Sequence, residues 1–500
     1  MITINKKRIT NLLVIIFCLI IVASLYIKFT FRDQTIEEIL FYAFNGGENS
    51  SSDVFITAIK KAILPLIVFV GIILFVKNRF FENHQVKFTL AFFTLTLLIF
   101  TFSLRVDLFI KNSLASSDFI EENYIDGRKV NITFPEKKKN LIVIFAESME
   151  NSLIDKELGG GWEYSVMPEL EELALSNTNF SNNKKIGGFY HTNGSTWTVS
   201  GIVAITSGIN MKVSMANTYT SDNFLSGTYA LGDILKENGY NLKVCMGSDS
   251  KAGNKDKYFL SHGNYDIFDF NYAVDNGYMK SEDKVWWGFD DTDLFKWTKE
   301  ETLELAKDDK PFNLVIETAN THFENGYLEE EAPKKFNTQY ENVYSYNSTQ
   351  INEYINWVKE QDFYKDTTIV VLGDHLGMQT DFYEDNMIDG HERSVYNVFI
   401  NPSTEPKNSK NRTMTSFDMY PTILASIGAN IEGNQLGLGV NLFSDKETLS
   451  EKYGYDFLNE EVGKNSKFFN DFILGDDYKD VIKLEKEKEA KEKEEAKNKK

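Results

Sequence analysis

Cysteine is scarce in this sequence, with only two among 500 residues. Cys18 lies inside an apolar run and Cys245 inside a strand-like run, which excludes a disulfide framework and a zinc site built from thiolates. Stability must therefore come from burial of apolar side chains. The 42% hydrophobic content of the chain is enough for one sizeable core.

Positive charge is also in short supply. The chain has 53 Lys and Arg against 73 Asp and Glu, a formal net charge of -20. Nucleic-acid backbones are held by clustered Lys and Arg, and no such cluster is present, so no nucleic-acid partner is expected. An anionic ligand would need a local positive site, such as a metal ion.

Long apolar runs are present near the N-terminus, at Leu12–Ile27, Ala62–Val76 and Phe88–Phe102. A membrane-spanning helix needs about 20 residues, a length that each run reaches with its flanks. We expect spans at about 9–29, 60–77 and 87–108. A cleaved signal peptide is the alternative for the first run, but no small-residue cleavage site follows it and two further spans come after.

Basic residues near the spans predict the orientation. Those at positions 6–8 and those between the second and third spans favour a cytoplasmic location for both segments, which Lys60 and Lys61 partly oppose. Three spans then leave the rest of the chain outside the cytoplasm, as the extracytoplasmic domain of a cell-membrane protein. We expect a membrane anchor over 1–110, a linker over 111–136, an extracytoplasmic domain over 137–475, in which any catalytic residues would lie, and a charged Lys/Glu tail over 476–500.

The soluble part alternates short apolar strands with helical patterns, which is typical of an α/β domain with a largely parallel sheet. The clearest strands are expected at about 140–147, 240–247, 313–320, 368–374 and 395–401, and helices at 167–175, 227–237 and 340–359.

Two of these strands end in acids, Glu147 in one case and Asp374 followed by His375 in the other. Ligands of open α/β sheets bind at the carboxyl ends of the strands. Each acid alone could equally be a helix cap or a loop carboxylate. Together, two carboxylates and an imidazole make a donor set suited to zinc or manganese.

Between these acids in sequence lies a hydroxyl-rich segment, STWTVSGIVAITSG (195–208). If Thr198 begins a helix, its hydroxyl lies beside free backbone N–H groups that stabilise phosphate. A hydroxyl activated by a metal is a nucleophile. The alternative is that these hydroxyls only cap and pack a helix, and the pattern alone leaves both open.

Several motifs occur in an order that resembles the lipoteichoic acid synthase and phosphoglycerol transferase group, a sulfatase-like branch of the alkaline phosphatase superfamily. They are NLIVIFAESME (140–150), STWTVSGIVAITSG (195–208), GNKDKYFLSHGNYDIFDF (253–270), TANTHF (318–323), GDHLGMQ (373–379) and SFDMYPTILASIGANIEGNQLGLGVNLF (416–443). The resemblance covers about 137–445 and implies a sulfatase-like α/β fold preceded by a helical anchor.

The resemblance also implies roles for individual residues. Thr198 is expected to be the catalytic nucleophile and, with Glu147, Asp374 and His375, a metal ligand. The metal is expected to be Mn2+, with Zn2+ or Mg2+ as alternatives. Substrate-binding residues are expected among His322, Lys255, Asn254, Arg393 and His391. Lys255 stands where the synthases carry an arginine and Gly253 where they carry a tryptophan, so the donor pocket departs from theirs.

The expected reaction moves glycerol phosphate from phosphatidylglycerol to a cell-envelope glycan or a polyglycerol-phosphate (teichoic acid) acceptor, through a covalent threonine intermediate. A true sulfatase would need a C/S-x-P-x-R motif, which the segment around Thr198 lacks. A phosphoethanolamine transferase, another sulfatase-like phosphoesterase, or an inactive relative acting as a scaffold are the remaining alternatives.

Overall fold

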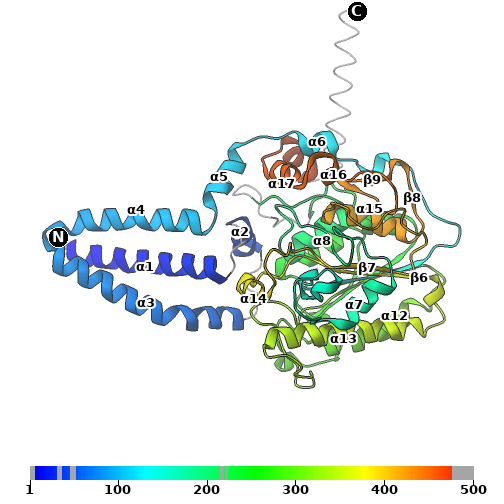
Figure 1. The fold of residues 1–500 in the computed structure, drawn as a ribbon, viewed down its shortest axis with the longest axis horizontal. Helices are drawn as coiled ribbons and strands as arrows, with labels where there is room; N and C mark the ends of the chain where they lie inside the picture. The colour runs from blue at the N-terminus through cyan, green and yellow to red at the C-terminus, as the bar shows by residue number, and fades with distance from the viewer. Residues whose placement is uncertain (1–5, 31–35, 46–51, 214–218, 220–222, 476–500) are drawn as a thin grey trace, which may run out of the picture.

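A helical anchor projects from an α/β domain in the computed structural model, which describes residues 6–30, 36–45, 52–213, 219 and 223–475 (Figure 1). The helices of the anchor and of the segment that follows it are α1 (Lys6–Thr30), α2 (Ile36–Asn45), α3 (Ser52–Phe80), α4 (Gln85–Ser103), α5 (Val106–Leu114) and α6 (Phe119–Asn123). The expected charged tail at 476–500 lies outside the described residues.

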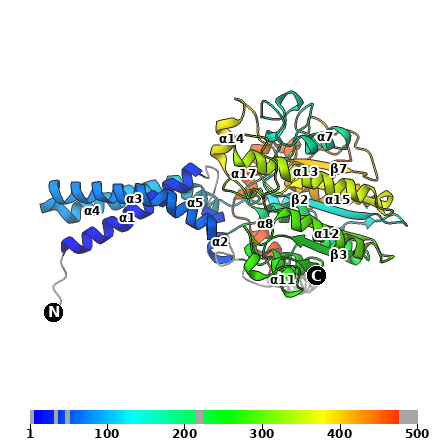
Figure 2. The ribbon, with the colours of Figure 1, turned by 90° about the horizontal axis from the view of Figure 1, so that it is seen from below.

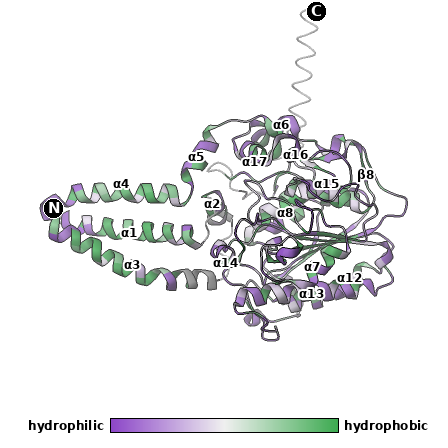
Figure 3. Cartoon of the chain, viewed as in Figure 1, coloured by the Kyte–Doolittle hydropathy of each residue, from purple (hydrophilic) through white to green (hydrophobic). Residues whose placement is uncertain are grey.

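Three of these helices are long and apolar enough to cross a membrane, at Lys6–Thr30, Ile59–Phe80 and Glu82–Ser103. Figure 3 shows them as a largely hydrophobic bundle set apart from the mixed surface of the domain. Most of their large apolar side chains are exposed, as lipid-facing side chains would be. The third helix ends earlier than expected, because the chain turns at Leu104 and Arg105, the latter with a left-handed φ of 52°.

The central sheet has six strands in the order β4-β3-β5-β2-β6-β7. Its first five strands are parallel and β7 is antiparallel to β6. The strands of the domain are β1 (Ile132–Thr133), β2 (Asn140–Ala146), β3 (Asn241–Met246), β4 (Asp266–Phe268), β5 (Phe312–Glu317), β6 (Thr367–Gly373), β7 (Asn397–Ile400), β8 (Asn430–Ile431), β9 (Gln435–Leu436) and β10 (Gly439–Val440). The expected α/β fold with a largely parallel sheet is confirmed.

Helices cover both faces of the sheet (Figure 2). The helices of the domain are α7 (Pro168–Ser176), α8 (Thr198–Ser207), α9 (Leu231–Glu237), α10 (Lys255–Ser261), α11 (Phe270–Asp275), α12 (Asp291–Leu305), α13 (Gln339–Lys359), α14 (Thr380–Asn386), α15 (Ser416–Ser426), α16 (Leu449–Tyr453) and α17 (Tyr455–Gly463). Alternate residues of β2 serve the two faces: Val143 packs with α8, α9 and α15, whereas Ile144 packs with α7, α12 and α13. Because β2 is buried on both sides, its sequence is a continuous apolar run.

The segment 111–136, expected as a linker, is folded onto the domain. Phe119 and Ile120 belong to its core, β1 pairs with β8, and Ile125 bridges to Gly437. The chain therefore leaves the anchor along the surface of the domain.

Close packing of α8 beneath the end of β6 requires a glycine at position 201. A Cβ there would stand 2.2 Å from the carbonyl oxygen of Asp374, far inside contact distance. Gly201 thus lets the helix that begins at Thr198 approach the strand end that carries Asp374.

We expect Gly201→Ala to lower the free energy of unfolding of the domain by about 1–3 kcal/mol, because helix and strand must separate. Thermal or chemical unfolding of the full chain in detergent measures this. Gly71→Ala adds the same methyl group in α3, where nothing lies within 4 Å, and should leave the domain transition unchanged. Equal stability of the two variants would contradict this account of α8.

Candidate active site

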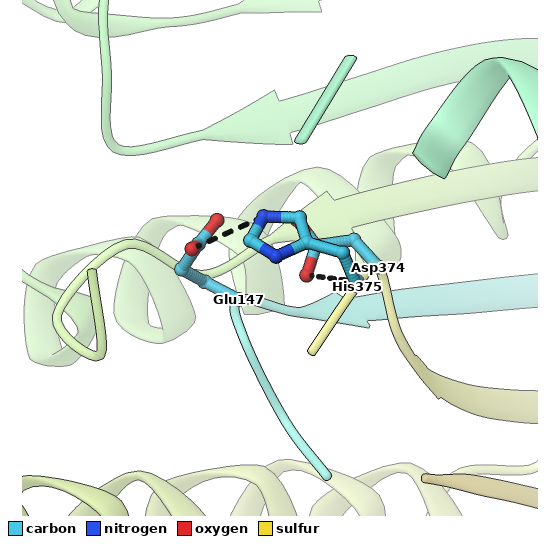
Figure 4. A group of neighbouring side chains, drawn as sticks. All are labelled: Glu147, Asp374 and His375. Atoms are coloured by element: carbon cyan, nitrogen blue, oxygen red, sulfur yellow. Dashed lines mark hydrogen bonds and ion pairs between the residues drawn. The ribbon is translucent and has the colours of Figure 1, made fainter. Parts of the chain in front are cut away.

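The carboxyl ends of the parallel strands gather the candidate residues. Ala146, the last residue of β2, pairs with Gly373, the last of β6, so Glu147 and Asp374 follow at the same level of adjacent strands. His375 continues from Asp374. These three side chains are buried and each offers a ligand atom within 4.8 Å of the others (Figure 4).

Thr198 completes this cluster from the other side. It is the first residue of α8, and its Oγ1 lies 3.1 Å from Glu147 Oε2, to which it donates, and 3.5 Å from His375 Nε2. Two other hydroxyls of the segment have partners away from the cluster: Ser200 Oγ accepts from the backbone N–H of Trp197 and caps the helix, whereas Thr206 donates to the carbonyl of Ile202. Thr198 thus begins a helix, the condition on which its hydroxyl lies beside free backbone N–H groups.

Hydrogen bonding orients the imidazole of His375 toward the acids. Its Nδ1 donates to the carbonyl of Leu376 at 2.8 Å, which leaves the lone pair of the neutral ring on Nε2. Nε2 lies 3.6 Å from Glu147 Oε1 and 3.4 Å from Asp374 Oδ2. Burial disfavours the imidazolium form, but the two carboxylates raise the pKa of His375 above its ordinary value.

The two carboxyl groups of the cluster differ in their pKa values. Burial and the charge of Glu147 raise the pKa of Asp374 well above its usual range. Burial also opposes ionisation of Glu147, yet His375 and His322 lower its pKa. Two buried carboxylates this close repel each other unless a proton or a cation lies between them.

A divalent cation fits these residues. For a tetrahedral ion with bonds of about 2.1 Å, neighbouring ligand atoms stand about 3.4 Å apart, close to the 3.1–3.6 Å separations of this cluster. No donor among the described residues hydrogen-bonds Asp374 Oδ2, which is buried. An oxygen-rich set with one imidazole suits manganese, zinc or magnesium.

The adjoining cavity is lined by Glu147, Thr198 and two of the expected substrate residues, His322 and Lys255. His322 follows β5, and its Nδ1 donates to the carbonyl of Phe323 at 2.8 Å. Burial lowers the pKa of His322, which favours the neutral ring. Lys255 is buried, donates to Ser248 Oγ at 2.8 Å and forms an ion pair with Glu317.

Three other expected substrate residues are not among the described residues that line this cavity. Arg393 binds the fully buried Glu150 through both Nε and Nη2, as expected of an arginine that holds the chain together. The ring of His391 lies against Gly161. Asn254 precedes α10 with a left-handed φ of 57° and donates to the carbonyl of Tyr219, so it shapes the turn that carries Lys255.

Sequence reasoning missed several residues that line the cavity. Glu317 ends β5 and follows the same rule that singled out Glu147 and Asp374, so it could have been found. Trp287, whose ring centroid is 4.6 Å from that of His322, and Tyr42, which comes from α2, had no such signal.

The fold is an α/β domain with a buried acid–imidazole cluster at the carboxyl ends of its parallel strands, and comparison with known proteins identifies its family. Residues 139–429 match the sulfatase family model, so the chain belongs to the sulfatase family. The crystal structure of the lipoteichoic acid synthase LtaP from Listeria monocytogenes is similar in fold, with a TM-score of 0.51 and 17% identity over 65% of this chain and 81% of that one.

Curated relatives include phosphoglycerol transferase I of Escherichia coli O6:K15:H31, 29% identical over 337 residues, and that of Xanthomonas campestris pv. campestris, 26% identical over 323 residues. The matches cover 64% and 62% of this chain. The chain spans only 41% and 43% of the length of these relatives.

If the cluster binds a metal ion, Mn2+ should stabilise the full chain, by about 2.7 kcal/mol at a free concentration 100 times Kd. Glu147→Gln removes one charged ligand and should abolish most of this gain in a thermal-unfolding titration. Glu341→Gln is the matched control, because Glu341 is also buried but caps α13 by accepting from the backbone of Thr338. An equal response of both variants to Mn2+ would contradict a metal site at Glu147.

Proposed function

We propose that this protein is a membrane-anchored, metal-dependent phosphoglycerol transferase. It moves glycerol phosphate from phosphatidylglycerol to a cell-envelope glycan or polyglycerol-phosphate acceptor. The observation that carries the proposal is the position of Thr198 Oγ1, at the start of α8 and 3.1 Å from Glu147 and 3.5 Å from His375. The names of the curated relatives, phosphoglycerol transferase I, support the choice of the transferred group.

Thr198 is the nucleophile of this reaction. Its Oγ1 attacks the phosphorus of the donor, an Oγ1–phosphorus bond forms, and the bond from phosphorus to the diacylglycerol oxygen breaks. Glu147 Oε2, which already accepts from the hydroxyl, is the first acceptor of the threonine proton. The departing diacylglycerol oxygen takes up this proton from Glu147, and glycerol phosphate stays esterified to Thr198. An acceptor hydroxyl then displaces it, and the proton of that hydroxyl returns to Thr198 Oγ1.

Glu147, Asp374, His375 and Thr198 would hold a divalent ion, which supplies positive charge that favours deprotonation of the hydroxyl and offsets charge at phosphorus. The free backbone N–H groups of the first turn of α8 face the same phosphoryl group. Lys255 offers it a point charge, shared with Glu317. The neutral His322 presents Nε2 as a base for the incoming acceptor hydroxyl.

The anchor keeps the domain beside its lipid donor and so raises the effective concentration of that donor. We place residues 1–110 in the anchor and 137–475 in the catalytic domain, with that domain outside the cytoplasm. Both cysteines are buried and unpaired. This favours a phosphoglycerol transferase over a phosphoethanolamine transferase, for which disulfide bonds are expected.

Incubation of the full chain with phosphatidylglycerol and Mn2+ should produce a glycerophosphate ester on Thr198, detected by mass spectrometry of the peptide that contains it. Thr198→Ala should lose the ester and lower kcat/KM by at least about 10³-fold. Thr206→Ala is the matched control, because its hydroxyl bonds within the same helix and it should keep the ester. An ester formed only with phosphatidylethanolamine, or none on the wild-type chain, would contradict the proposed donor.

A further inference from the structure

The short helix α2, which lies between the first two long apolar helices, packs against the catalytic domain rather than standing free (Figure 1). Phe41 is fully buried in the domain core. Its ring centroid is 5.6 Å from that of Trp197 and 6.0 Å from that of Tyr219. Trp197 immediately precedes Thr198, so α2 is held by the residue next to the candidate nucleophile.

The next residue of α2, Tyr42, reaches the cavity itself. It lines the same cavity as Thr198, Lys255 and His322. Opposite stands Gly253: a Cβ there would lie 3.8 Å from Phe41 Cε1 and 3.9 Å from Tyr42 Cε1. The aromatic rings of α2 therefore occupy the space over a position that has no side chain of its own.

The buried Glu38 of the same helix also acts on the cluster. Burial raises the pKa of the Tyr42 hydroxyl, and the charges of Glu38 and Glu147 raise it further. Glu38 adds to the field of Asp374 and Glu147 at His375. One turn of α2 thus carries two side chains that interact with the candidate active site.

Two further helices of the anchor meet the domain two residues away from His322, which lines the cavity. Glu324, which follows His322 by two residues, is 6% exposed and accepts from Lys61 of α3 at 2.6 Å and from the Tyr26 hydroxyl of α1. The three contacts with α1, α2 and α3 come from separate parts of the anchor. They converge on the segments that carry His322, Gly253 and Thr198.

We propose that α2 completes the active site, with Tyr42 as the wall that determines which lipid head groups fit. The phosphodiester head group of a membrane lipid is held between α2 and the catalytic domain, and the Tyr42 ring restricts it to a small head group. This rests on the proposed function, because it assumes a lipid phosphodiester as donor. The ring supplies the wall, so its removal enlarges the cavity without touching Thr198, Glu147, Asp374 or His375.

The test compares variants of the full chain in phospholipid nanodiscs that contain phosphatidylglycerol or phosphatidylinositol, whose inositol head group is larger than glycerol. Tyr42→Ala should raise the KM for phosphatidylglycerol about tenfold, the loss of one aromatic contact, with kcat within about twofold of wild type. It should also admit phosphatidylinositol better than wild type does. Tyr42→Phe keeps the ring and should restore most of the head-group restriction that Tyr42→Ala loses. Tyr453→Ala, which truncates an exposed tyrosine of α16, is the control and should match wild type. An unchanged KM and unchanged head-group preference in Tyr42→Ala would overturn the proposal.

A second measurement does not depend on turnover. Tyr42 and Ala252 both line the cavity, and the double variant Tyr42→Cys/Ala252→Cys places one thiol at each position. Both native cysteines are buried, so they should not compete for a crosslinking reagent. A short bismaleimide should link them within one chain in membranes, and failure to link would overturn the placement of α2. If the pair links but wild type turns over neither lipid, the proposed function fails while α2 keeps its place.

Discussion

The structure depends on two carboxyl groups that are buried side by side at the ends of adjacent parallel strands. Glu147 and Asp374 cannot both be charged at this separation without a compensating cation, since the low-dielectric interior leaves their repulsion nearly unscreened. The protein holds them there through the register of β2 and β6, which no side-chain movement can relax. This repulsion favours a bound cation between the two carboxylates. Without a cation, the same repulsion would destabilise the folded domain.

The position of Thr198, the proposed nucleophile, follows from the same strand ends. Helix α8 can approach Asp374 only because residue 201 has no side chain, and its first residue then meets Glu147 and His375 together. Backbone N–H groups, a threonine hydroxyl and the acid–imidazole cluster are brought to one point by helix packing. The ends of two strands and the start of one helix therefore determine the geometry of this cluster.

The membrane anchor takes part in this arrangement. Its described contacts with the domain include Phe41 beside Trp197, and Lys61 with Glu324, two residues after His322. Under the proposed function the cavity must open toward the bilayer, and contacts close to the cavity residues fix that orientation more directly than a linker would. The folded segment 111–136 adds a second connection between anchor and domain.

Much of the fold and the centre of the site could be predicted from the amino-acid sequence. Apolar runs bounded by polar residues marked the strands, and Glu147, Asp374 and His375 stood at the strand ends, because such patterns are local and follow from burial. Only the tertiary structure decided the rest. Arg393 pairs with Glu150, Lys255 with Glu317, and Tyr42 reaches the cavity from a distant helix. These contacts join residues that are far apart in the sequence. They depend on which segments the fold brings together, and a local sequence pattern does not reveal that.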